Sequence, residues 1–173
     1  MTTSTAAVAA AGPSFVEGPD RWAIEVLGRQ HGLTRVSRDG SGLRVRLGDQ
    51  VPADHVPTVA PRPSHLGSLL VADLATDGTV TLVARCAPPA LVFADGEARL
   101  LPNDGSVRAT ARLRPGDLLV MCSASALEAN PAGVVDLLAG PRPARQGDLG
   151  DLVRRLLSSS LLGAAAAARF DGP

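Results

Sequence analysis

The chain is poor in aromatic side chains and has no tyrosine. Aromatic residues make up 2% of its 173 residues, which argues against a base-stacking surface or an aromatic sugar site. Neither sign of charge is in excess, because Lys+Arg and Asp+Glu number 17 each. No overall field therefore draws the chain to nucleic acid or to anionic lipid, and we expect neither as a partner.

Cysteines and long hydrophobic runs are also scarce. Cys86 and Cys122 both lie in apolar runs, so we expect them to be buried and free, and two thiols cannot form a zinc site alone. No apolar stretch reaches the roughly 18 residues that a membrane-spanning helix needs. Residues 1–18 have no basic segment before their short alanine-valine run, so we expect a disordered tail rather than a signal peptide. We expect a cytoplasmic protein with a single domain over residues 19–170.

Short strands separated by turn residues are the main feature that the chain does have. Residues 33–49 alternate apolar and polar side chains around an Asp-Gly-Ser-Gly turn, which predicts a β-hairpin. Asp-Gly and Pro-Pro turns separate the runs that follow, as is typical of an antiparallel meander. These runs cover residues 66–74, 79–86, 91–93, 98–101 and 107–113. Residues 50–63 contain four prolines and no periodicity, so we expect a loop there.

A continuous apolar run from Leu118 to Cys122 follows a Pro-Gly-Asp turn and predicts a strand buried on both faces. Small polar residues come directly after it, at a position where many sandwich enzymes place their chemistry. Helices are expected at residues 132–138, after Asn130-Pro131, and at residues 148–157. Residues 21–29 and 161–170 fit a helix or a strand about equally.

In this order of elements the chain resembles the metal-dependent serine/threonine phosphatases of the protein phosphatase 2C (PPM) family, in particular the SpoIIE-like branch. The similar stretches are LLVADLATDGTVTLVARCAPPA, LVFADGEARLLP and LRPGDLLVMCSASALEA, with a weaker similarity in RDGSGLRVRLGD, which ends at Gly48-Asp49. The resemblance implies an α+β fold, an antiparallel β-sandwich flanked by helices. The helices that the family inserts after its first Gly-Asp are expected to be reduced here to a loop.

The resemblance also implies two divalent metal ions, held by aspartates at one end of the sandwich, where they activate water for attack on phosphorus. Only Asp49 matches a ligand position of the family. Ala124 and Ser125 stand where the family has Asp-Gly, and Leu161 and Leu162 stand where it has acidic residues. The sequence therefore predicts no catalytic residue and no cofactor. Asp49 is either a vestigial metal ligand or a turn aspartate satisfied by backbone donors.

Other polar residues give weaker signals. Ser123 and Ser125 lack the glycine elbow and the basic partner that a nucleophile requires, so we expect strand-end hydroxyls. The histidines lie in expected loops or edges and have no third ligand beside them, even where Asp54 adjoins His55. They are His31, His55 and His65. Arginines on the expected strands form either a solvated face or a phosphate-recognising cluster. They are Arg44, Arg46, Arg108 and Arg112.

These observations favour a non-catalytic, phosphatase-like regulatory or protein-interaction module in bacterial serine/threonine-phosphorylation or sigma-factor partner-switching signalling. Its expected partner is a protein, and open sheet edges also allow a homodimer. One alternative is an active phosphatase that binds Mn²⁺ or Mg²⁺ through Asp49 together with Asp54, Asp73 or Asp104. A second alternative is an unrelated β-rich binding domain that has similar turns.

Overall fold

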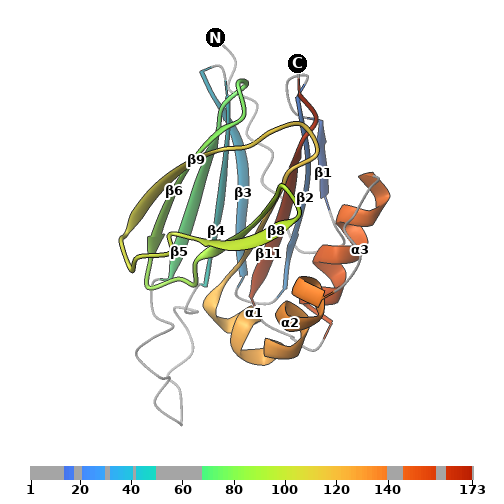
Figure 1. Cartoon of the computed structure of the whole chain (residues 1–173). Helices are drawn as coiled ribbons and strands as arrows, with labels where there is room; N and C mark the ends of the chain where they lie inside the picture. Colours follow the sequence, from blue (N-terminus) through green and yellow to red (C-terminus); the bar gives the residue numbers. More distant parts are fainter. Residues whose placement is uncertain are drawn as a thin grey trace.

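The computed structural model describes residues 14–17, 21–29, 32–40, 42–49, 68–139, 146–158 and 163–172. Two antiparallel β-sheets face each other, and helices cover the far side of one of them (Figure 1). The α+β sandwich expected from the sequence is confirmed. Residues 50–67, where we expected a loop in place of helices, lie outside the described residues. No helix within the described ranges is long and apolar enough to cross a bilayer.

One sheet has five strands, and alternation of apolar and polar side chains gives it a buried and an open face. In spatial order the strands are β3 (Gly32–Asp39), β4 (Gly42–Asp49), β5 (Leu69–Leu74), β6 (Thr79–Arg85) and β9 (Arg108–Arg112). On β4, Leu43, Val45 and Leu47 are buried between the sheets, whereas Arg44 and Arg46 lie on the opposite face. The hairpin over residues 33–49 is thus confirmed as β3 and β4.

The other sheet has six strands and lies between the five-stranded sheet and the helices. In spatial order the strands are β1 (Ser14–Glu17), β2 (Trp22–Gly28), β11 (Ala164–Phe170), β10 (Leu118–Cys122), β7 (Ala90–Ala94) and β8 (Glu97–Leu101). On β10, Leu119 and Met121 pack against the five-stranded sheet, whereas Leu118 and Val120 pack against the helices. This strand is buried on both faces, as predicted.

Three helices connect β10 to β11: α1 (Ala124–Ala129), α2 (Pro131–Ala139) and α3 (Gln146–Leu156). Helix α3 buries an apolar stripe that includes Leu149, Leu152 and Val153 against the six-stranded sheet. The buried amide of Asn130 donates to the carbonyls of Arg155 and Leu156, at 3.0 and 3.2 Å. These bonds satisfy carbonyls at the end of α3 and join it to the start of α2.

Several expectations need correction. Strands β7 and β8 belong to the other sheet, and β6 pairs with β9, so residues 66–101 do not form one meander. The chain changes sheets at Pro88-Pro89, where two residues without an N–H cannot extend a ladder. Residues 14–17, which we placed in a disordered tail, form β1 and pair with β2, while the rest of residues 1–18 lies outside the described residues.

The two segments that fitted a helix or a strand are both strands. Residues 22–28 are β2, and residues 164–170 are β11, which pairs with β2 on one side and β10 on the other. Alanine favours helices, but here its small side chains let β11 lie in the crowded centre of the molecule between two layers. Both cysteines are free, as expected, but Cys86 is exposed rather than buried, because it lies in the turn after β6.

Candidate functional site

The candidate site lies at one end of the sandwich, where β4 and β10 end and β11 begins. Figure 1 shows α1 at this end, below the ends of β4 and β11. The backbone N–H of Ser123 donates to the carbonyl of Ala164 at 2.8 Å, and the N–H of Ala164 donates to the Ser123 hydroxyl at 3.0 Å. These two bonds hold the residues after β10 against the start of β11, next to Asp49.

The carboxylate of Asp49 is surrounded by donors from two other segments. Its Oδ2 accepts the Ser68 hydroxyl at 2.8 Å and the backbone N–H of Ser125 at 3.1 Å. Its Oδ1 accepts the Ser125 hydroxyl. In return, the N–H of Asp49 donates to the carbonyl of Ser68 at 3.3 Å. A carboxylate has about four acceptor positions, so three donors use most of them. Asp49 is therefore a structural acceptor that joins β4 to the segments before β5 and after β10.

Gly163 closes the site from the side of β11. A Cβ atom at this position would lie 2.6 Å from the Ser125 hydroxyl oxygen, 2.7 Å from that of Ser123 and 2.8 Å from the Ala126 nitrogen. Its φ of +94° is also one that residues with a side chain rarely adopt. Glycine is thus required at position 163, and the two serine hydroxyls, 3.2 Å apart, pack directly against its backbone.

The thiol of Cys122 lies at the same end of β10. Burial raises its pKa from the ordinary 9.0 to about 11, and the negative charge of Asp49 contributes to the shift. Both effects disfavour the thiolate, which is the nucleophilic and metal-binding form of cysteine. Near neutral pH, Cys122 is therefore held in its neutral thiol form.

The residues present do not fit a two-metal centre. In the parts of the chain that the structure describes, no three His, Cys, Asp or Glu side chains are grouped so as to hold a metal ion. Divalent cations of this kind need several oxygen ligands, mostly carboxylates, whereas Asp49 shares its site with two serine hydroxyls, and Ala124, next to Ser125 in the chain, has no side-chain oxygen. Leu161 and Leu162, the other degenerate positions, lie outside the described residues.

The alternative ligands are not brought to Asp49. Asp73 pairs with Arg44, five residues from Asp49 along β4, or roughly 17 Å at the rise of a strand. Asp104 is exposed in the turn between β8 and β9 and accepts the N–H of Ser106 at 3.0 Å. Asp54 and the three histidines lie outside the described residues.

The sequence analysis missed Ser68, which is 3% exposed and holds Asp49 from the side of β5. Its only signal in the sequence is its position directly before an apolar strand. The register identifies Ser68 as the partner of Asp49. Gly48 lies opposite Leu69 in the antiparallel pair, so Asp49, which follows Gly48, comes next to Ser68, which precedes Leu69.

Comparison with solved structures shows that the fold is that of protein phosphatase 2C domains. The RsbU and RsbW domains of Rv1364c from Mycobacterium tuberculosis match with a TM-score of 0.64 and 19% identity, over 95% of this chain and 63% of that chain. The PP2C phosphatase domain of SpoIIE from Bacillus subtilis was solved with a fragment of its regulatory domain. It matches with a TM-score of 0.60 and 11% identity, over 88% of this chain and 63% of that chain. RsbX in complex with magnesium matches with a TM-score of 0.60 and 10% identity, over 91% of this chain and 99% of that chain.

The present chain covers less than two thirds of the first two of these structures. Neither a scan against protein-family models nor a search of curated proteins finds a match. The similarity at these low identities is one of fold. It confirms the expected phosphatase 2C-like architecture.

Proposed function

We propose that this chain is a non-catalytic, phosphatase-like module that acts through protein contacts in bacterial serine/threonine-phosphorylation or partner-switching signalling. The fold supports the phosphatase-like part. Structures with the same fold include the phosphatase domain of the cell fate determinant SpoIIE and the RsbU and RsbW domains of one mycobacterial protein. A further structure with this fold belongs to work on the bacterial stressosome, a modular system adapted to control secondary messenger signalling.

The observation that carries the non-catalytic part is the set of hydrogen bonds at Asp49. Ser68 and Ser125 supply three donors to the one carboxylate that matches a ligand position of the family. To bind a metal ion, Asp49 would have to give up these bonds, and Ala124 offers no oxygen in compensation. Phosphoryl transfer by this fold depends on its metal ions to activate water and neutralise phosphoryl oxygens. A site that satisfies its carboxylate internally favours a structural role over a catalytic one.

Calorimetric titration of Mn²⁺ and Mg²⁺ into the purified chain tests this proposal, with the Asp49→Ala variant titrated alongside. Hydrolysis of an aryl phosphate is measured on the same preparations, and an active phosphatase of the same fold serves as the positive control. We expect no saturable binding at millimolar metal and no hydrolysis above the buffer rate.

Saturable binding at micromolar metal that is lost in Asp49→Ala would overturn the proposal. In that case an active phosphatase with an atypical ligand set becomes the leading account. Hydrolysis that persists in Asp49→Ala would also overturn the proposal and place the chemistry elsewhere in the chain.

A further inference from the structure

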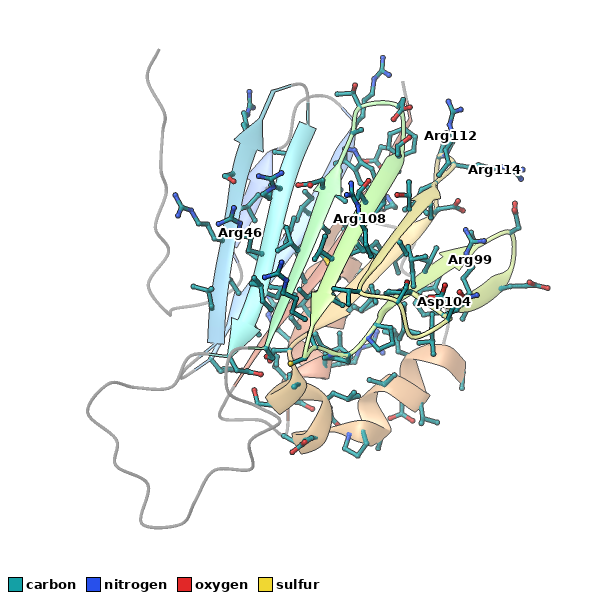
Figure 2. The ribbon with its side chains drawn as sticks, turned by 90° about the vertical axis from the view of Figure 1, so that its left-hand side faces the viewer. Arg46, Arg99, Asp104, Arg108, Arg112 and Arg114 are labelled. Atoms are coloured by element: carbon teal, nitrogen blue, oxygen red, sulfur yellow. The ribbon has the colours of Figure 1, made fainter. Side chains whose placement is uncertain are left out.

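The outer face of the five-stranded sheet is strongly basic, although the chain as a whole has a formal net charge of zero. Side chains on this face alternate with the buried ones, so the register identifies them. Among the side chains that the structure describes on this face, a set of arginines accompanies one carboxylate, that of Asp73. The arginines are Arg35, Arg44, Arg46, Arg85, Arg108 and Arg112. Figure 2 looks at the molecule from this side and shows Arg46, Arg108 and Arg112 spread over the sheet.

Most of these guanidinium groups have no partner within the described residues. Arg44 is bound by Asp73. The hydrogen bonds from the backbone N–H and the hydroxyl of Thr79 are the main causes that lower the pKa of Asp77, and the charge of nearby Arg112 adds to that shift. Arg35, Arg46 and Arg108 are exposed, and the described part of the chain supplies their guanidinium groups with no hydrogen bond or ion pair. The surface thus presents free positive charge rather than a network of internal salt bridges.

One row across the sheet shows how this charge is arranged. Arg35 lies directly opposite Arg46 on β3 and β4, Val71 and Val83 follow on β5 and β6, and Arg108 ends the row on β9. Arg46 and Arg108 are three strand spacings apart, or about 14 Å. Like charges directly opposite each other destabilise a sheet. The Arg35 and Arg46 pair therefore costs stability in the free protein, and an anionic group between the two would relieve that cost.

We infer that this face binds an acidic segment of a protein partner, with carboxylates on the outer arginines and apolar side chains on Val71 and Val83. Charge complementarity selects the chemistry of the occupant. All 17 basic residues of the chain are arginines, whose planar groups bind carboxylates through two parallel hydrogen bonds. A nucleic acid fits less well, because no aromatic side chain lies among the residues of this row to stack on bases, and half-buried valines occupy its centre.

Fluorescence anisotropy with a labelled peptide of glutamates and interspersed leucines tests the inference on the full chain, at low and at physiological salt. The test variant is Arg46→Gln with Arg108→Gln, which removes two charges from the face. The matched control is Arg154→Gln with Arg155→Gln, which removes two charges from exposed positions on α3. All four side chains are exposed. Removing Arg46 relieves its repulsion with Arg35, and the Arg154–Asp151 pair lost in the control is an exposed ion pair of little stability, so neither variant should melt well below the unaltered chain.

We expect the unaltered chain and the α3 variant to bind the peptide equally. The Arg46/Arg108 variant should bind at least about fivefold more weakly, and binding by the unaltered chain should weaken with salt. Equal binding by all three proteins, or no binding at low salt, would overturn the inference. Stronger binding of duplex DNA than of the peptide would overturn it in favour of a nucleic-acid partner.

This inference adds the chemistry of the partner to the proposed function. It rests on the proposed function in one respect, which is that both require a protein partner. Their failures are distinguishable. Metal binding or aryl phosphate hydrolysis would overturn the non-catalytic proposal and leave peptide binding unaffected. Failure to bind the peptide would overturn the basic docking face and leave the metal titration unaffected.

Discussion

The hydroxyl and the backbone N–H of Ser125 both donate to the carboxylate of Asp49, although the two residues are 76 positions apart in the chain. This relationship joins the end of β4 to the segment after β10 and thereby ties the two sheets together at one end. In a metal-dependent phosphatase of this fold, cations would balance the carboxylates at this end. Among the described residues at this end, neutral donors surround the carboxylate of Asp49, so hydrogen bonds hold β4 to the neighbouring segments.

The first prediction follows from those bonds. We expect Asp49→Ala to lower the free energy of unfolding by about 1 to 3 kcal/mol, because it leaves the donors of Ser68 and Ser125 without an acceptor. Urea denaturation followed by circular dichroism measures the change. Asp104→Ala is the control, since Asp104 is exposed and bonded only within its own turn, and it should change stability by less than about 0.5 kcal/mol.

The sign of this effect distinguishes the two interpretations of Asp49. In a two-metal site without its ions, removing one carboxylate relieves repulsion among the remaining ones and leaves stability unchanged or raised. An Asp49→Ala variant as stable as the unaltered chain would therefore contradict a structural role for Asp49.

A second prediction concerns Ala124 and Ser125 together. The double variant Ala124→Asp with Ser125→Gly adds a carboxylate at the degenerate position and removes the hydroxyl that donates to Asp49. We expect this variant to bind Mn²⁺ saturably at millimolar metal, where the unaltered chain should show no saturable binding, since hard cations gain most from added carboxylate oxygens. Calorimetric titration measures the difference, with Ser125→Gly alone as the control. Equal affinities for all three proteins would mean that position 124 does not face Asp49.

Most of the fold could be predicted because its strands have clear local sequence signals. The hairpin of β3 and β4 has both its alternation and its turn in the sequence, and β10 has a continuous apolar run after a breaker. Strand β11 could not be assigned, because five consecutive alanines from Ala164 to Ala168 carry no periodicity. Only its place between β2 and β10 makes it a strand. Tertiary context there outweighs the helix propensity of alanine.

The site could be predicted less completely than the fold. The sequence singled out Asp49, Ala124 and Ser125, but it did not indicate that Ser125 is the partner of Asp49. That contact depends on how the end of β4 meets the start of α1, which no local pattern encodes. Ser68 was missed for the same reason. The assignment of β7 and β8 to the other sheet also depends on long-range pairing, which turn chemistry does not specify.

A third prediction tests how closely the site is packed. We expect Gly163→Ala to destabilise the protein by more than about 2 kcal/mol, because a methyl group would contact the Ser123 and Ser125 oxygens at under 3 Å. Gly96→Ala is a matched control, since Gly96 has a φ of +92° against +94° for Gly163 but has open space around it. The control should therefore carry only the backbone cost of about 1 kcal/mol. Equal losses in thermal or urea unfolding would show that the serine hydroxyls do not confine Gly163.

The fourth prediction concerns alkaline pH. The chain contains no lysine and no tyrosine, so cysteine is the only residue type in it that ordinarily titrates at moderately alkaline pH. In the folded protein, burial and the charge of Asp49 raise the pKa of Cys122 to about 11, against an ordinary value of 9.0. The unfolded chain therefore loses the Cys122 proton first as the pH rises. Stability conferred by the neutral thiol is complete below pH 9 and is lost as the pH rises from about 9 to about 11.

The expected loss over that range is on the order of 2 kcal/mol, and urea unfolding at a series of alkaline pH values measures it. Cys122→Ala should remove most of this pH dependence. Cys86→Ala should keep it, because Cys86 is exposed and free. The same burial should make Cys122 react more slowly than Cys86 with a disulfide reagent at pH 8, since the thiolate is the reacting form. If the Cys122→Ala variant lost stability with pH as steeply as the unaltered chain, the titrating group would be another residue. That result would contradict a pKa of Cys122 raised by burial and by the charge of Asp49.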